Sequence, residues 1–252
     1  MMQATRDSRE DIRKPLAVAA VLVAYSNLGA ALAWARGWNA ELTFRYINPL
    51  FLLVLVPYSA KEMGGLKGAG LHKKGWGTST AWGAPVGVGL ASSSIFFFAN
   101  PLVSDAPLEY KPITDMSRGE LALDLMVRVP VSIAFFEELA FRGLLYGMLR
   151  RRLPAWKAIG ISAAAFGLWH AGVTAISVMQ TSVASANRLP GFLQDYVVPL
   201  GAVGGVVVTG LAGVAFGMLR ERTGNLAGPI VAHWIADGLM IGALWWMSNG
   251  GK

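Results

Sequence analysis

Cysteine is missing from this sequence of 252 residues. Its absence excludes a disulfide framework, a thiolate nucleophile and a cysteine-ligated metal, so any metal ion would need His and carboxylate ligands. Charged residues are also scarce, at 15% against about 25% in soluble domains, while 54% of the residues are hydrophobic and the mean hydropathy is +0.47. These shortages exclude an ordinary water-soluble fold and favour a membrane protein.

The apolar residues are gathered in long runs separated by short connectors. A helix needs about 20 residues to cross the hydrocarbon core, and most of the runs have that length. We expect an all-α polytopic transmembrane bundle of about seven spans, with eight as the alternative count. The N-terminal segment is too long and too acidic for a signal peptide, so the first run is expected to be a retained span. The runs cover residues 15–35, 46–60, 77–100, 120–149, 158–180, 199–219 and 226–248.

Positive charge is distributed unevenly between successive connectors. Fourteen of the 22 Lys and Arg residues lie on one side of the expected bundle and six on the other. Because positive connectors are retained in the cytoplasm, we predict a cytoplasmic N-terminus and an external C-terminus, in the plasma membrane of a prokaryote. The net charge of +7 then reflects orientation and lipid head groups, and no nucleic-acid partner is expected.

Two segments 70 residues apart are similar. Residues 141–152 (FRGLLYGMLRRR) and 211–222 (LAGVAFGMLRER) match at six of twelve positions. Glycines four residues apart and a basic stop are common at the ends of membrane helices, so general membrane composition explains the similarity as well as an internal duplication does.

Ionisable side chains inside the expected spans are few and costly. Each costs about 2.5–3.5 kcal/mol near the bilayer centre, so each needs a partner or a function. Asp124 and Arg128 are four residues apart, and we expect them to form a structural ion pair on one helix face. The full set comprises Asp124, Arg128, Glu137, Glu138, Arg142, His170, His233 and Asp237.

Two adjacent glutamates in the fourth run differ in their local partners. Arg142 lies four residues after Glu138 and can neutralise it, whereas Glu137 has no local cation. At 1.5 Å per residue, Glu137 and His170 lie about 18 Å from the same membrane face, on consecutive helices. His233 and the residue four positions later enter the same slab from a third helix. We therefore expect three helices to bring these groups together.

Three short motifs in this region carry a family resemblance. EELAFR at 137–142 resembles an EExxxR motif, FGLWH at 166–170 an FxxxH motif, and HWIAD at 233–237 an HxxxN/D motif. All three, in this order, are similar to those of the CAAX protease and bacteriocin-processing (CPBP) family, also called the Abi or type II CAAX prenyl-protease family. The resemblance covers about residues 120–247. It implies N-terminal transmembrane helices and loops in 1–119, and a protease core in 120–252 whose four C-terminal helices carry the catalysis.

The resemblance implies an intramembrane endopeptidase with a membrane-embedded cavity that opens to the cytoplasm. Glu137 would act as general base, with His170 helping to position the attacking water. His233 and Asp237 would face the oxyanion. The implied supporting residues are Glu138, Arg142 and Phe166.

Asp237 departs from the commonest form of the family, which has Asn at this place. An ionised Asp would repel an oxyanion, so Asp237 would have to be protonated, orient His233, or lie near a cation. The last option keeps a metal-dependent alternative open, and the family is often labelled metalloprotease. Glu137, His170 and His233 would then bind Zn²⁺, with Glu138 as base.

Substrate choice is not encoded in these motifs. The expected partners are the bilayer and a peptide or protein substrate, with lipidated and membrane-bound substrates among the alternatives. The connector at 181–198 is either a lid or a simple link. Two other functions remain as alternatives, a non-catalytic membrane scaffold of the same fold and a transporter, which should have two comparable inverted halves.

Overall fold

The structure is a computed structural model that describes residues 11–99, 110–181 and 195–249. Within these ranges the regular secondary structure is helical, and one isolated bridge joins Tyr110 and Thr181. The helices are α2 (Arg13–Ala35), α3 (Ala40–Met63), α4 (Trp76–Phe98), α5 (Lys111–Thr114), α6 (Arg118–Leu123), η1 (Asp124–Phe135), α7 (Phe136–Glu138), η2 (Leu139–Leu145), α8 (Tyr146–Arg150), α9 (Ala155–Trp169), α10 (Ala171–Met179), α13 (Val197–Thr223) and α14 (Ala227–Asn249).

Nearly all the described residues of the seven apolar runs lie on helices, which confirms the all-α prediction. Four helical segments are long and apolar enough to cross a membrane: α2, α9 with α10, α13 and α14. The protein is therefore an integral membrane protein. The total number of spans stays a prediction, because the other three runs are richer in charge or in small and polar residues.

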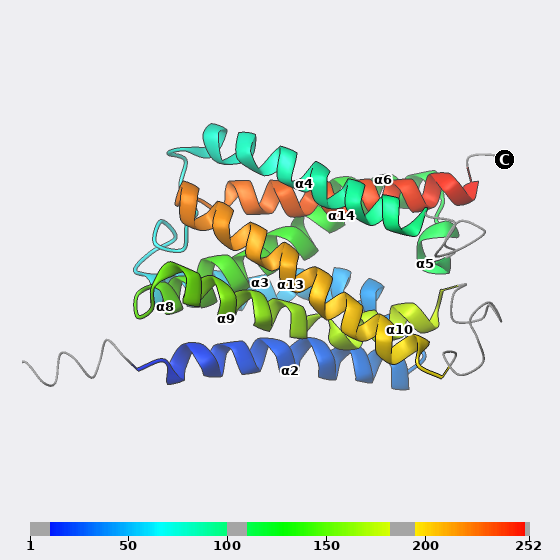
Figure 1. Cartoon of the computed structure of the whole chain (residues 1–252), viewed down its shortest axis with the longest axis horizontal. Coiled ribbons are helices and arrows are strands. Elements are labelled where there is room, and N and C mark those ends of the chain that lie inside the picture. The colour runs from blue at the N-terminus through cyan, green and yellow to red at the C-terminus, as the bar shows by residue number, and fades with distance from the viewer. Residues whose placement is uncertain (1–10, 100–109, 182–194, 250–252) are drawn as a thin grey trace, which may run out of the picture.

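The helices lie side by side, and the described connectors alternate between the two ends of the bundle (Figure 1). The connectors at 64–75, 151–154 and 224–226 lie together on the left of that view. α4 packs along α14, and α13 packs along α9. The first of these pairs approaches closely, since a Cβ atom at Gly83 would lie 2.2 Å from the carbonyl oxygen of Gly228. Small residues permit this close approach between membrane helices.

The long helical segment from α6 to α8 differs from the regular α-helix expected for the fourth run. It begins at a capping box, in which Ser117 accepts from the backbone N–H of Glu120 at 3.2 Å and donates its own N–H to the Glu120 carboxylate at 2.9 Å. Beyond it, η1 and η2 have π-helical turns. Pro130 lies inside η1 and brings no N–H donor to the helix. Such turns are frequent at functional sites, and here they flank the two glutamates.

The prediction for Asp124 and Arg128 is confirmed, with an addition from a distant helix. The two side chains form an ion pair at 3.0 Å, and Arg45 on α3 also binds the Asp124 carboxylate. Arg45, one of the six basic residues on the less positive side, is not a connector charge, because its side chain is 1% exposed inside α3. α3 starts at Ala40, ahead of the apolar run, and so includes Arg45. Without Arg45 the charge asymmetry between the two ends increases, and the orientation itself stays a prediction.

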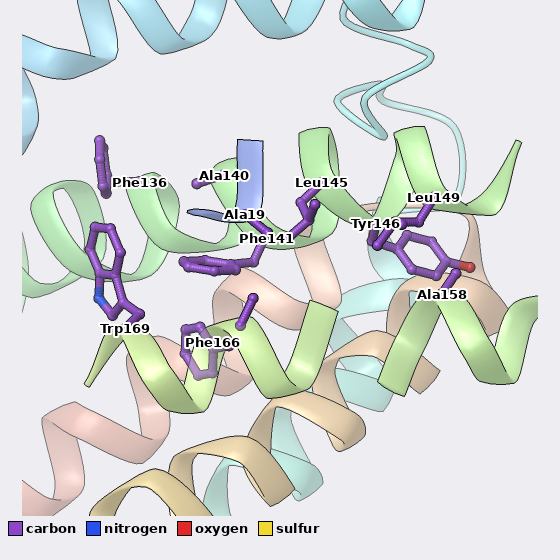
Figure 2. Close-up of a cluster of buried hydrophobic side chains, with 11 residues drawn as sticks. Ala19, Phe136, Ala140, Phe141, Leu145, Tyr146, Leu149, Ala158, Phe166 and Trp169 are labelled. Carbon is purple, nitrogen blue, oxygen red and sulfur yellow. The ribbon is translucent and has the colours of Figure 1, made fainter. Parts of the chain in front are cut away.

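An aromatic cluster joins the glutamate-bearing segment to α9 (Figure 2). Phe141 meets Phe166 edge-on at a centroid distance of 5.1 Å and Trp169 at 5.4 Å. Phe136 lies 6.0 Å from the same indole. In a bilayer such packing, rather than release from water, holds helices together. The cluster therefore fixes the position of α9 relative to Glu137 and Glu138, which lie between Phe136 and Phe141 in the sequence.

Candidate active site

Four of the predicted site residues meet at one place in the bundle. The carboxylate oxygen Oε2 of Glu137 lies 3.6 Å from Nε2 of His170 and 4.0 Å from Nε2 of His233. Nε2 of His233 also lies 3.5 Å from the Asp237 carboxylate. The structure thus brings together side chains from α7, α14 and the junction between α9 and α10.

Glu138 supports this group from behind. One of its oxygens, Oε1, accepts from Nη1 of Arg142 at 3.0 Å and is 2.9 Å from Nδ1 of His233. The local pair with Arg142 follows the four-residue spacing, whereas the contact with His233 joins residues 95 positions apart. Both glutamates are buried, and Glu138 is fully enclosed. Glu138 therefore holds His233 and Arg142 through a single oxygen.

The Arg142 guanidinium lies against two phenylalanine rings. Its Cζ atom is 4.0 Å from the centroid of Phe166 and 5.2 Å from that of Phe216. Phe166 also meets His170 edge-on at 4.7 Å, and Phe216 stacks on His233 at 5.2 Å with an interplanar angle of 21°. These contacts give the Phe166 of the FxxxH motif a place in the site, since it links Arg142 with His170.

Phe216 was not among the predicted site residues. It occupies, in segment 211–222, the position that aligns with Tyr146 in segment 141–152. An aromatic residue at the same place in both similar segments was the available signal. A core phenylalanine in an apolar helix gives the same signal, so the sequence could not separate the two roles.

His170 lies where α9 ends and α10 begins. Its Nδ1 lies 2.8 Å from the carbonyl oxygen of Phe166. A carbonyl can only accept, so Nδ1 carries the hydrogen in this bond and, in the neutral ring, Nε2 is an acceptor. The FxxxH spacing therefore serves two purposes, because the backbone of Phe166 fixes the tautomer that points Nε2 at Glu137.

Asn225 fixes the start of the helix that carries His233. Its Oδ1 accepts from the N–H of Ala227 at 2.8 Å, and its Nδ2 donates to the carbonyls of His72 at 2.7 Å and Lys74 at 3.2 Å. The preceding Gly224 has φ +65°, a left-handed conformation that ends α13. We did not predict this role, although Asn directly before an apolar run is a common helix N-cap.

The site is buried on one side and accessible on the other. The Glu137 side chain is 7% exposed, while those of His170 and Asp237 are 20% and 27% exposed. Oε2 of Glu137 has no hydrogen-bond partner within the described protein. Buried carboxylate oxygens are normally satisfied by protein or water, so this enclosed atom is an acceptor that the described protein leaves unsatisfied.

The predicted metal ligands can be examined in the same geometry. Among the described residues, no group of three or more His, Asp or Glu side chains is arranged to hold a metal ion. The metal-dependent alternative, with Glu137, His170 and His233 as the ligands, stays a prediction. The predicted lid or link at 181–198 falls mostly on residues 182–194, which lie outside the described part of the chain.

Comparisons with known proteins agree with the motifs. Searches of curated proteins and of solved structures found no match to this chain. A family model described as "Type II CAAX prenyl endopeptidase Rce1-like" matches residues 120–239, which include the Glu137, His170 and His233 motifs and the helices that bear them. Residues 120–239 are thus similar to the type II CAAX prenyl endopeptidase Rce1-like family, which supports the resemblance seen in the motifs.

Proposed function

We propose that this protein is an intramembrane endopeptidase that hydrolyses a peptide bond with a water molecule held between Glu137 and His170. The observation that carries the proposal is the approach of two acceptors, Oε2 of Glu137 and Nε2 of His170, to 3.6 Å. Two atoms at that separation can both lie within about 2.8 Å of one water oxygen. Water has two hydrogens, so it can donate one to each acceptor and leave a lone pair free for attack.

Hydrolysis of a peptide bond by this water takes two steps, attack on the carbonyl carbon and loss of the leaving nitrogen. Glu137 removes a proton as the water oxygen attacks the scissile carbonyl carbon, which gives a tetrahedral oxyanion. The C–N bond then breaks, and the proton on Glu137 passes to the leaving nitrogen. His170, fixed through Nδ1, keeps the water in line during attack.

His233 and Asp237 are proposed to stabilise the oxyanion. Carboxylates face both ring nitrogens of His233, with Glu138 at 2.9 Å from Nδ1 and Asp237 at 3.5 Å from Nε2. In this proposal Nδ1–H of His233 is held by Glu138, and Nε2–H, whose nitrogen lies 3.5 Å or more from the Asp237 and Glu137 carboxylates, is the group that donates to the oxyanion. This arrangement supports the version in which Asp237 orients His233. A well-placed donor of this kind contributes about 2.7–4 kcal/mol.

The proposed substrate is a peptide or protein chain that reaches the site from the cytoplasm, with the protein in a prokaryotic plasma membrane. The connectors at 64–75 and 151–154 are rich in Lys and Arg and lie at one end of the bundle (Figure 1), which supports a cytoplasmic position for that end. A lipid-modified substrate would suit a site inside a membrane. The family description names prenyl endopeptidases, and this supports testing prenylated peptides first.

The test is peptide cleavage by detergent-purified protein, over a library with and without prenylated C-termini, for the wild type and Glu137→Gln. We expect the substitution to lower kcat by about 10²–10⁴-fold, as for loss of a general base. Thermal stability should stay close to that of the wild type, because Oε2 of Glu137 makes no hydrogen bond in the protein. Glu62→Gln serves as the matched control, since Glu62 pairs with Lys14 at the bundle end.

Each result has a distinct meaning. Cleavage that depends on Glu137 and persists in a chelator supports glutamate-activated water. Cleavage that a chelator abolishes and Zn²⁺ restores would replace this mechanism with the metal-dependent one. Equal cleavage by the wild type and Glu137→Gln, at a level no higher than a blank preparation, would favour the non-catalytic scaffold.

A further inference from the structure

A single asparagine on α2 reaches the helix break that carries His170. Nδ2 of Asn27 donates to the carbonyl of Leu168 at 3.0 Å, and Oδ1 of Asn27 accepts from the N–H of Gly172 at 2.8 Å. Nδ2 also donates to Val23 within its own helix at 2.8 Å. The amide therefore contacts the chain on both sides of His170.

The two backbone groups that Asn27 binds are normally partners of each other. In an uninterrupted α-helix, the N–H of residue 172 would donate to the carbonyl of residue 168. The side-chain amide bridges this donor and this acceptor, so both stay satisfied where α9 ends and α10 begins. A helix break inside a bilayer needs such a replacement, because lipid offers no hydrogen bonds.

The backbone around the break is shaped to admit the amide. A Cβ atom on Gly172 would lie 3.0 Å from Oδ1 of Asn27 and 3.3 Å from Cβ of Ala30, closer than most side chains tolerate. Glycine at 172 thus leaves room for Asn27. On the other side of the break, the N–H of His170 donates to Gly167 at 3.0 Å, which tightens the turn before the ring.

The break sets the direction of the His170 ring. That ring must hold its Nδ1 bond to Phe166 and also place Nε2 near Glu137. Backbone hydrogen bonds hold both ends of the turn that bears it, and Asn27 adds two side-chain hydrogen bonds across the junction. A shift of about 1 Å at such a position can cost about 10²-fold in rate.

We propose that Asn27 is a positioning residue for His170, which acts by holding the break between α9 and α10 open in the geometry that aims Nε2 at the attacking water. The inference rests on the proposed function for its effect on catalysis. It assigns a role to a helix outside residues 120–239, so the matched region would not be sufficient to build the site.

The test uses full-length protein with Asn27→Leu, which keeps similar volume and removes the two hydrogen bonds to the break along with the one to Val23. Asn27→Gln retains the amide and serves as the conservative variant. Asn39→Leu is the matched control, because Nδ2 of Asn39 donates to the side chain of Gln180 at 3.2 Å, just beyond the end of α10 and away from His170. Gly172→Ala disturbs the same contact from the opposite side.

Two measurements are needed. In the cleavage assay, we expect Asn27→Leu and Gly172→Ala to lower kcat by about 10–100-fold with KM within about twofold, and Asn27→Gln to recover part of the loss. Nitrogen-15 NMR of labelled histidine is simple here because the chain has three His residues. The His170 ring signals should move in Asn27→Leu, while those of His72, which contacts Gly224 at the C-terminal end of α13, stay in place.

The outcomes separate this inference from the proposed function. Unchanged kcat and unchanged His170 signals in Asn27→Leu would overturn it. Lost activity with unmoved His170 signals would also overturn it, since α2 would then act by another route. If Glu137→Gln proved fully active, the proposed function would fail, and the NMR result would still decide whether Asn27 orients His170.

Discussion

Replacement of Arg142 tests the electrostatic support of the site. The guanidinium is enclosed with Glu138, at 3.0 Å, and both side chains are at most 1% exposed. In Arg142→Met the carboxylate would keep only His233 as a partner, and the contacts with the Phe166 and Phe216 rings would lose their cation. Lysine would not substitute fully, because it lacks the planar group that stacks on a ring.

The expected cost follows from burial. Removing one partner of a buried ion pair costs about 3–5 kcal/mol, mostly because the other charge is left uncompensated. For a chain of this size, that corresponds to a melting temperature lower by about 6–20 °C, at about 2–4 °C per kcal/mol. Adding Glu138→Gln to Arg142→Met removes both charges and keeps an acceptor for Nδ1 of His233. The double variant should therefore be more stable than Arg142→Met alone.

Thermal unfolding in detergent, followed by tryptophan fluorescence, measures the difference. Arg150→Met is the control, because Arg150 pairs with Glu221 at 3.1 Å where both side chains are well exposed. Such a surface pair contributes about 0–1 kcal/mol. The reasoning is refuted if Arg142→Met costs no more than Arg150→Met, or if the double variant loses the sum of the two single losses.

Three further predictions concern packing around the site. Gly83→Ala should lower the melting temperature and loosen α4 from α14, because its Cβ would meet a backbone carbonyl at 2.2 Å. Gly89→Ala is the control, since nothing lies within 4 Å of a Cβ at that position. Equal melting temperatures for the two variants would contradict this prediction. Asn225→Ala removes the N-cap of α14 and should cost about 0.5–2 kcal/mol in detergent unfolding, and an unchanged unfolding curve would show that the cap is dispensable. Phe216→Leu removes the ring stacked on His233 and should lower kcat more than it raises KM in the cleavage assay, while a pure KM effect would assign Phe216 to substrate binding.

Much of the architecture was readable from the sequence. Apolar runs of membrane-spanning length predicted the helices, and the four-residue spacing predicted the pairs Asp124–Arg128 and Glu138–Arg142. Both signals are local, since they depend on the period of a helix and on the cost of charge in lipid. The three motifs predicted which side chains would form the site. Each motif is a short local pattern within one helical segment or at its end, so it can be read without knowing which helices are neighbours.

Other features needed the tertiary structure. Arg45 binds Asp124 across 79 positions, Glu138 meets His233 across 95, and Asn27 reaches Gly172 across 145. No spacing rule links residues so far apart, and each of these contacts depends on which helices are neighbours. The sequence also did not predict the π-helical turns around the glutamates, because a continuous apolar run looks the same for an α-helix and a π-helix. The sequence alone determined which residues had to be satisfied inside the membrane, and the packing of the helices decided which partners satisfy them.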